Sequence, residues 1–125
     1  MKNPILGIIG GGQLGSLLSV AANRIGIKTV ILSDDENAPA KNFTEKFIYG
    51  KYDNKSITQE FINSVDLVTY EFENIPFNIL QSINNEKTVL PKPEINNLIQ
   101  NRLTEKNFLN DICLLYTSDA ADDST

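Results

Sequence analysis

The fold is decided by residues 5–32, which read ILGIIGGGQLGSLLSVAANRIGIKTVIL. The apolar run at 5–9 has the length of a strand, and the glycines at 10–12 interrupt it. Apolar residues then recur with helical spacing, which predicts one buried helix face made of Leu14, Leu17, Leu18, Ala21, Ala22 and Ile25. Gly26 suits the left-handed position that ends a helix, and a β-branched strand follows at 27–32. The segment therefore predicts a βαβ unit with parallel strands.

The rest of the chain continues this alternation. Further strands are predicted at 47–49, 67–70 and 88–90. A helix should follow Ser56 and Gln59, which form a capping box, and another should carry Pro76 in its first turn. Apolar residues between Ile95 and Phe108 mark further helical stretches. The predicted fold class is α/β, a Rossmann-like parallel sheet flanked by helices.

Composition limits the chemistry. The chain has 125 residues, enough for one domain, and no histidine, which excludes Ser/His and Cys/His nucleophile pairs. Cys113 is the single cysteine, so no internal disulfide can form and a cytoplasmic location is expected. Scattered basic residues and a net charge of −5 argue against nucleic acid as a partner. The stretch from Ile5 to Ala22 is too interrupted for a membrane span, and its glycine spacing favours a turn over a signal peptide.

The glycine turn is a candidate anion site. Gly10, Gly12 and Gly15 fit the pattern G-x-G-x-x-G between a predicted strand and a predicted helix. Glycines allow a tight turn, let a phosphate approach backbone N–H groups, and permit close packing of helix on strand. A turn that binds nothing is the plainer alternative. A dinucleotide site would also need an acid after the second strand, and Asp34 lies near that place, although the 34–36 segment is also typical of a solvated acidic turn.

Two acids lie beyond the strand at 67–70. Glu71 and Glu73 flank Phe72, so strand geometry would place both side chains on one face. Such a pair can accept hydrogen bonds from sugar hydroxyls or hold a cation, and solvated loop acids are the alternative. Arg102 is a candidate phosphate contact, or an ion-pair partner of Glu105.

Several motifs together resemble one family. They are Gly10-Gly11-Gly12-Gln13-Leu14-Gly15, the segment 35–40 (DENAPA), the segment 68–76 (VTYEFENIP), Pro91-Lys92-Pro93, and the segment 100–109 (QNRLTEKNFL). In this order they resemble the amino-terminal, pre-ATP-grasp domain of the 5-(carboxyamino)imidazole ribonucleotide synthetases, which are ATP-grasp enzymes of purine biosynthesis. The resemblance covers residues 4 to 112 and implies a chain truncated before the ATP-grasp domains.

The resemblance implies a ligase that uses ATP with Mg²⁺. Such an enzyme activates bicarbonate as carboxyphosphate and carboxylates the amine of 5-aminoimidazole ribonucleotide. By this resemblance Gly12, Gln13 and Leu14 would cradle the phosphate of the ribonucleotide, Glu73 would accept from its ribose or amine, and Arg102 would touch ATP phosphate. No catalytic residue and no metal ligand falls within the fragment, which is expected to be inactive alone. Pairing into a homodimer is also suggested.

The chain departs from the family at several places. Ser33 and Asn101 stand where the family often has acids. The resemblance gives residues 1–112 as the Rossmann-like domain with the start of the following segment. Residues 113–125 (CLLYTSDAADDST) look like translated sequencing-adaptor sequence, or else a short natural tail.

Other functions stay open at this point. Formate-dependent glycinamide ribonucleotide transformylase and biotin carboxylase begin with similar glycine turns. An NAD(P)-binding domain of an oxidoreductase, or a regulator that binds NAD, is a different class of function. A small non-catalytic nucleotide-binding module is a further alternative.

Overall fold

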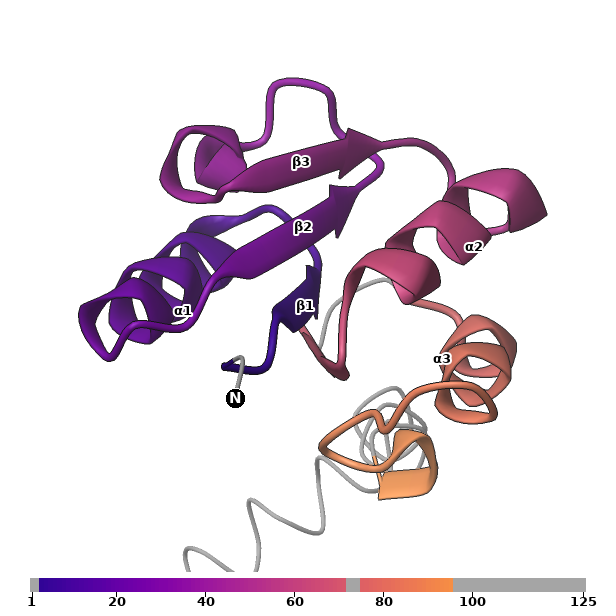
Figure 1. Ribbon diagram of the computed structural model, residues 1–125. Helices are drawn as coiled ribbons and strands as arrows, with labels where there is room; N and C mark the ends of the chain where they lie inside the picture. The colour runs from indigo at the N-terminus through magenta and orange to yellow at the C-terminus, as the bar shows by residue number, and fades with distance from the viewer. Residues whose placement is uncertain (1–2, 72–74, 96–125) are drawn as a thin grey trace, which may run out of the picture. The chain divides into compact units, whose positions relative to one another are not determined.

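The computed structural model describes residues 3–71 and 75–95, and the chain divides into two units after Pro93 (Figure 1). The first unit carries the secondary structure discussed below. In chain order its elements are β1 (Leu6–Ile9), α1 (Gln13–Arg24), β2 (Thr29–Ser33), the 3-10 helix η1 (Pro39–Phe43), β3 (Lys46–Tyr49), α2 (Lys55–Ser64), β4 (Leu67–Tyr70) and α3 (Phe77–Asn84).

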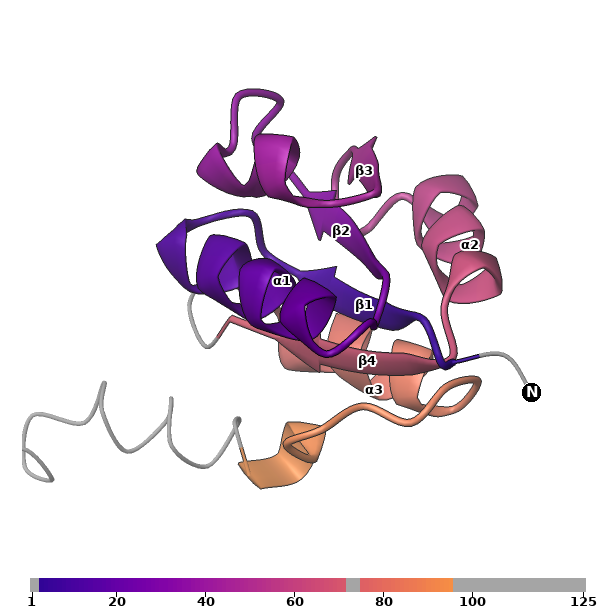
Figure 2. The same cartoon turned by 60° about the vertical axis from the view of Figure 1, so that its left-hand side comes forward.

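The four strands form one parallel sheet in the order β3-β2-β1-β4. In the register, Ile8 of β1 lies opposite Ile31 of β2 on one side and Thr69 of β4 on the other. Helices connect the strands and lie on both faces of the sheet (Figure 2). This arrangement confirms the predicted α/β, Rossmann-like fold, and it brings the carboxyl ends of all these strands to one edge.

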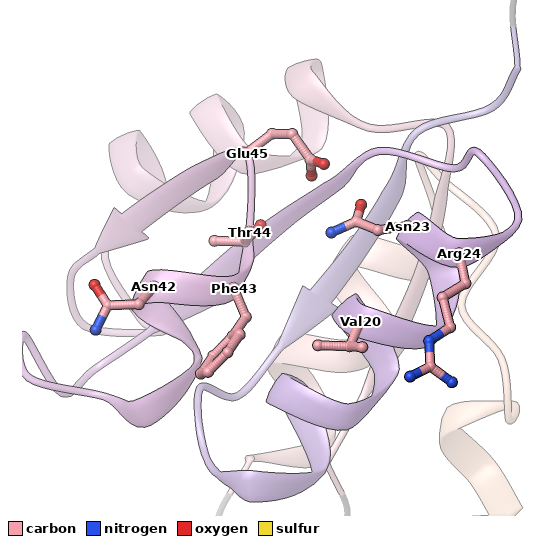
Figure 3. A pocket seen from close by; sticks show the side chains of 7 residues that line it. All are labelled: Val20, Asn23, Arg24, Asn42, Phe43, Thr44 and Glu45. Atoms are coloured by element: carbon pink, nitrogen blue, oxygen red, sulfur yellow. The ribbon is translucent and has the colours of Figure 1, made fainter.

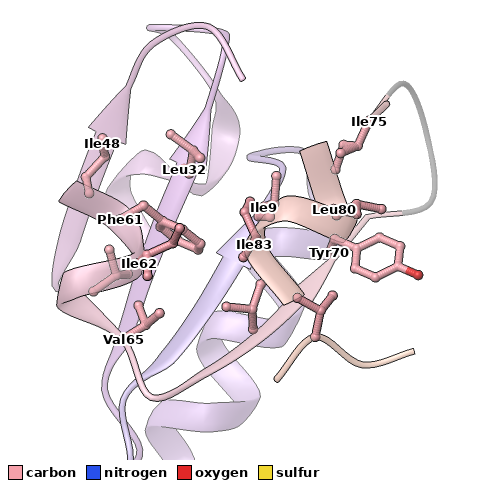
Figure 4. Close-up of a cluster of buried hydrophobic side chains, with 13 residues drawn as sticks. Ile9, Leu32, Ile48, Phe61, Ile62, Val65, Tyr70, Ile75, Leu80 and Ile83 are labelled. Carbon is pink, nitrogen blue, oxygen red and sulfur yellow. The ribbon is translucent and has the colours of Figure 1, made fainter. Parts of the chain in front are cut away.

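Each face of the sheet has its own core. Helices α2 and α3 cover the face that holds the larger cluster, whose labelled members include Ile9, Leu32, Phe61, Tyr70 and Leu80 (Figure 4). Helix α1 and η1 cover the opposite face, where Ile8, Ile31 and Ala40 are buried and Leu18 packs against them. Because alternate residues of a strand point to opposite faces and both faces are covered, β1 and residues 30–32 of β2 are apolar without interruption.

The predicted buried face of α1 is wrong in part. Leu14, Leu17 and Ile25 are 44%, 67% and 72% exposed. The residues of α1 that are buried are Gly15, Ser19 and Ala22. Small residues face the sheet because the helix lies close to it: a Cβ atom at Gly15 would lie 2.5 Å from the carbonyl oxygen of Gly10. Leu14 and Leu17 therefore lie on the solvent side of the helix, while Leu18 packs against the core.

Two predicted helix starts also need correction. Helix α2 begins at Lys55, and its cap is Asn54, whose Oδ1 accepts from the backbone N–H of Ile57 at 3.2 Å. The capping box predicted at Ser56 therefore does not form. Pro76 immediately precedes α3 rather than lying in its first turn. Gly26 does take the predicted left-handed conformation, with φ of 82°.

The predicted fifth strand at 88–90 is reduced to a single bridge. Val89 pairs with Val68 in the parallel sense, and two hydrogen bonds of 2.9 Å hold it there: Val68 N–H donates to the Thr88 carbonyl, and Leu90 N–H donates to the Val68 carbonyl. Pro91 follows at once and lacks the N–H that would extend the pairing. The helical stretches predicted from Ile95 to Phe108 lie outside the described residues beyond residue 95. Within the described ranges no helix is both long and apolar enough to cross a membrane.

Candidate functional site

A cleft of about 190 Å³ lies at the carboxyl edge of the sheet. Its lining comes from the glycine turn, the loop after β2, the loop after β3 and the end of β4: Gly10, Gly11, Gly12, Ser33, Asp34, Asp35, Ala38, Pro39, Tyr52 and Glu71. Ligands of open parallel sheets bind at this edge, where the strand order reverses beside the first strand. The fold therefore places the glycine motif where binding is expected.

The glycine turn is tied to its neighbours by backbone hydrogen bonds. Gly10 has a φ of 114°, which favours glycine, and its N–H donates to the Leu32 carbonyl at 2.8 Å. The Gly11 carbonyl accepts from the N–H of Ala40 at 2.9 Å. A Cβ atom at Gly11 would lie 2.5 Å from the Cβ of Ala38, so a larger residue does not fit there. The turn is thus fixed between β2 and η1.

The carboxylate of Glu71 fills the inside of this turn. Glu71 continues the β1–β4 pairing, since its N–H donates to the Ile9 carbonyl at 2.9 Å. Its Oε1 accepts from the N–H of Gly15 at 2.8 Å. Cβ atoms at Gly10 and Gly12 would lie 2.7 Å and 3.1 Å from the Glu71 carboxylate oxygens. The glycines of the motif therefore make room for an internal carboxylate at the N-terminus of α1.

Other backbone donors of the turn remain available. Among the described residues, the N–H groups of Gly12, Gln13 and Leu14 have no hydrogen-bond acceptor. These N–H groups lie at the start of α1, where the helix dipole favours acceptors with negative or partial negative charge. The Gln13 side chain is exposed and that of Leu14 is half-exposed.

The opposite wall of the cleft is acidic. Asp34 and Asp35 follow β2 directly, and the Asp35 carboxylate accepts from the N–H of Asn37 at 2.9 Å. Together with Glu71 they bring three carboxylates to a small volume. No lysine or arginine lines this cleft among the described residues. The cleft is therefore suited to hydroxyl, amine or amide donors of a ligand.

Tyr52 adds a phenol to this wall. Burial, followed by the charge of Asp34 and then that of Glu71, raises the pKa of Tyr52 to about 12. Hydrogen bonds with the Asp34 backbone and the Ser33 side chain lower the pKa of Tyr52, but by less than burial and the two charges raise it. The hydroxyl consequently stays protonated at neutral pH and can donate a hydrogen bond.

Sequence reasoning identified only part of this lining. Gly12 lies in the cleft, and Gln13 and Leu14 begin the adjacent helix. Glu73 and Arg102 fall outside the described residues, so their predicted roles stay predictions. Tyr52 was not predicted, although its position shortly after a strand of a parallel sheet was a usable signal.

A second hollow, of about 500 Å³, lies at the amino edge of the sheet (Figure 3). Val20, Asn23 and Arg24 project into its rim from α1, and residues 42–45 form the other side. Glu45 at this hollow is held within the protein: its Oε2 accepts from the Thr29 N–H at 2.7 Å and from the Thr29 hydroxyl at 3.1 Å. This hollow is larger but lies away from the carboxyl edge, where ligands of parallel sheets bind, so the cleft beside the glycine turn is the better candidate.

Metal ligands do not cluster in the part of the chain that the structure describes. No group of three or more His, Cys, Asp or Glu side chains is placed there to hold a metal ion.

Comparison with known proteins gives a consistent result. The family model "Ribonucleotide synthetase preATP-grasp domain" matches residues 1–100. The N5-carboxyaminoimidazole ribonucleotide synthase of Brucella melitensis is 41% identical over 106 residues, covering 85% of this chain and 29% of that protein.

Solved structures agree with the sequence relatives. N5-carboxyaminoimidazole synthetase from Staphylococcus aureus, complexed with ADP, superposes with a TM-score of 0.76 at 35% identity, covering 87% of this chain and 29% of that one. The synthase from Aspergillus clavatus, in complex with ADP and 5-aminoimidazole ribonucleotide, gives a TM-score of 0.71 at 28% identity, covering 88% and 30%. The chain thus spans less than a third of the length of these relatives.

The fold, the glycine turn and the family match lead to the same assignment. The parallel sheet of order β3-β2-β1-β4 carries the turn in its first βα connection, and the match extends over most of the chain. The chain belongs to the ribonucleotide synthetase preATP-grasp domain family.

Proposed function

We propose that this chain is the ribonucleotide-binding, amino-terminal part of an ATP-dependent 5-(carboxyamino)imidazole ribonucleotide synthetase. In the complete reaction, bicarbonate attacks the γ-phosphate of ATP to give carboxyphosphate and ADP. The amine of 5-aminoimidazole ribonucleotide then attacks the carboxyl carbon, and inorganic phosphate leaves. The observation that carries this proposal is the glycine turn at the start of α1, whose N–H groups of residues 12–14 have no acceptor among the described residues and which lines an acidic cleft in a chain of this family.

The proposed ligand contacts are those of the turn and of the segment after β4. Gly12, Gln13 and Leu14 offer backbone donors at the start of α1. Glu73 is proposed to accept from the ribose or the amine of the ribonucleotide. Arg102 is proposed to contact ATP phosphate, with Mg²⁺ accompanying the nucleotide. Further contacts with ATP and Mg²⁺ are proposed to come from the part of the relatives' length that this chain does not span.

Binding to the 125-residue chain tests the ligand class. Isothermal titration calorimetry should detect binding of 5-aminoimidazole ribonucleotide to the chain. NADH and glycinamide ribonucleotide should bind at least about tenfold more weakly than this ribonucleotide. Tight binding of NADH with none of the ribonucleotide would overturn the proposal in favour of a dinucleotide-binding domain. Asp34 supports that alternative, because it lines the cleft directly after β2, where dinucleotide-binding domains carry the acid that binds a ribose hydroxyl.

A matched pair of variants localises the binding. Gln13→Pro removes one backbone N–H of the turn, and proline is compatible with the first position of a helix, so the variant should bind the ribonucleotide about threefold to tenfold more weakly, equivalent to one lost hydrogen bond of about 1 kcal/mol. Lys55→Pro makes the same change at the first position of α2, outside the cleft, and should leave the affinity unchanged. Equal effects of the two substitutions would contradict the proposed contact.

Turnover is not expected from residues 1–125 alone. ATP- and bicarbonate-dependent carboxylation needs nucleotide-binding elements that the relatives carry in their remaining length. An ADP-release assay should therefore show no ribonucleotide-dependent rate. Because the reaction consumes ATP, a cytoplasmic location is proposed for it.

Self-association through α1 is a further proposal. Leu14, Leu17 and Ile25 form an exposed apolar stripe on this helix, and such surface is costly in water. A homodimer that buries the stripe should be detectable by sedimentation equilibrium, and Leu17→Glu should shift it to monomer. A monomeric wild-type chain would indicate that the stripe is not a self-association surface.

A further inference from the structure

The second hollow, at the amino edge of the sheet, has the size of a small-molecule site. Its volume of about 500 Å³ lies within the range of about 300–1,000 Å³ that is usual for ligand pockets. It lies between α1 and the segment that joins η1 to β3, at the opposite edge of the sheet from the glycine turn. The proposed function does not use this hollow, so a ligand that binds there is a separate one.

An aromatic ring forms one wall of the hollow. The Phe43 side chain is 49% exposed and lines the same hollow as Val20 of α1 (Figure 3). The buried hydroxyl of Ser19 donates to the Phe43 carbonyl, and the hydroxyl of the next residue, Thr44, donates to the Thr29 carbonyl at 2.9 Å. These hydrogen bonds fix the backbone that carries the ring. The aromatic surface is therefore already in place before a ligand arrives.

Two polar side chains of α1 form the other wall. Asn23 and Arg24 are consecutive residues in the last turn of the helix, and both line the hollow. In Figure 3 the Asn23 amide points across the hollow toward Thr44, and the Arg24 side chain extends along the rim. Within the described residues, neither side chain has a hydrogen bond or an ion pair. The hollow thus offers an amide, with a donor beside an acceptor, and a guanidinium that always carries its charge.

These groups match the parts of a mononucleotide. An exposed aromatic ring stacks on the face of a nucleobase. An asparagine amide pairs with the adjacent donor and acceptor on the edge of adenine. A guanidinium binds a phosphate through two parallel N–H groups. Glu45, the one acid of the lining, accepts from Thr29 rather than pairing with Arg24, so the guanidinium remains available to an anion.

We propose that this hollow is a second ligand site, which binds an adenine mononucleotide with its base stacked on Phe43 and its phosphate on Arg24. Arg24 is the only cation in the described lining, which suits a single phosphate better than a triphosphate. The site is independent of the ribonucleotide assigned to the glycine turn, because the two lie at opposite edges of the sheet.

Three ligands test the proposal on the 125-residue chain. Saturation-transfer NMR measures the binding of adenosine monophosphate, at protein concentrations low enough to dissociate the proposed homodimer. Adenosine monophosphate should bind saturably. Adenosine, which lacks the phosphate, and ribose 5-phosphate, which lacks the base, should each bind at least about fivefold more weakly. Equal affinity for all three ligands, or no saturable binding of adenosine monophosphate, would overturn the proposal.

Substitution of the ring localises the base. Phe43→Leu keeps an apolar side chain but removes the aromatic face, so adenosine monophosphate should bind at least about fivefold more weakly. The matched control is Tyr49→Leu, which removes an aromatic residue of β3 that is 52% exposed and lies outside the hollow. This control should bind as the wild type does.

Substitution of the guanidinium localises the phosphate. Arg24→Gln should weaken adenosine monophosphate at least about fivefold but leave the affinity for adenosine unchanged. Lys51→Gln removes a positive charge from an exposed position outside the hollow and should change neither affinity. Arg24 is exposed, so its variant should keep the urea midpoint of the wild type and decides the test even if Phe43→Leu is unstable. Binding of adenosine monophosphate that is unchanged in Arg24→Gln would place the nucleotide elsewhere and overturn the proposal.

Discussion

The hydroxyl oxygens of Ser19 and Thr29 lie 2.6 Å apart, and both side chains are fully buried between α1 and the start of β2. Ser19 also donates to the carbonyl of Phe43, and the Thr29 hydroxyl lies 2.8 Å from that of Thr44. These contacts join α1, β2 and the segment before β3 at the amino edge of the sheet. Buried polar groups of this kind stabilise the fold only while all their hydrogen bonds are made.

Removal of the Thr29 hydroxyl should therefore destabilise the protein. Thr29→Val keeps the shape of the side chain but deprives Ser19 and Thr44 of a partner, which costs about 1–3 kcal/mol. Urea denaturation followed by circular dichroism measures the change. The control Thr88→Val alters an exposed threonine and should remain within about 0.5 kcal/mol of wild type. Equal effects of the two substitutions would contradict the network.

Substitution of Gly15 should damage both stability and binding. A Cβ atom there would lie 2.5 Å from the backbone carbonyl oxygen of Gly10, and backbone cannot move as a side chain does. Gly15→Ala is expected to cost about 1–3 kcal/mol or more, despite the higher helix propensity of alanine. Gly26→Ala is the comparison: its site is open but has a φ of 82°, so the cost is about 1 kcal/mol and ligand binding is unaffected.

The exposed face of α1 should tolerate truncation. Leu17 is 67% exposed in the single chain, so Leu17→Ala should change the free energy of unfolding by less than about 0.5 kcal/mol at protein concentrations low enough to dissociate the proposed homodimer. Leu80 of α3 is fully buried, and Leu80→Ala should cost about 2–5 kcal/mol. Both values come from the same urea experiment. A large loss with Leu17→Ala would mean that this face is covered in solution.

Stability should fall at high pH because of Tyr52. Its pKa is about 12 in the folded protein and 10.0 when unperturbed, so the unfolded chain loses the proton first as the pH rises. The contribution is fully present below pH 10 and is lost between pH 10 and about 12. Tyr52→Phe should flatten this part of the stability profile. If the free energy of unfolding falls equally steeply with pH in Tyr52→Phe and in the wild type, the loss of stability comes from other groups.

Residues 113–125 are proposed to be foreign to the domain, and deletion tests this. The shortened chain 1–112 loses three aspartates and no basic residue, so its formal charge changes from −5 to −2. Its urea midpoint and its affinity for the ribonucleotide should equal those of the full chain. A lower midpoint would show that the tail contributes to the folded structure.

The alternation of strands and helices was readable from the sequence because both faces of the sheet are covered. Strands such as β1 are then apolar throughout, and Gly10–Gly15 marks the first connection. The buried face of α1 was readable only in part: Ala22 and Leu18 face inward as predicted, whereas Leu14 and Leu17 do not. Its larger apolar residues follow a helical period, yet the sheet contacts the row of small residues through Gly15 and Ser19. Hydrophobicity alone cannot show that close approach, rather than apolar area, decides which side turns inward.

The candidate site was predictable only where its residues are neighbours in sequence. The turn from Gly10 to Gly15 forms a local pattern, whereas Glu71 reaches Gly15 from 56 positions away, through the pairing of β4 with β1. The sequence placed Glu71 at the right edge but not inside the turn. Tyr52 lies in a loop without a motif, and only the three-dimensional arrangement brings its hydroxyl to Asp34.

The pairing of β1 with β4 also sets an order of events during synthesis. The glycine turn, α1 and β2 emerge first from the ribosome, and they can associate through contacts that are short in sequence. The Gly15 N–H meets its carboxylate only after the chain has been extended to Glu71 and β4 has docked beside β1. Binding competence is therefore acquired late in folding, and a nascent chain that ends within α2 has its glycine turn but lacks the side chain that completes it.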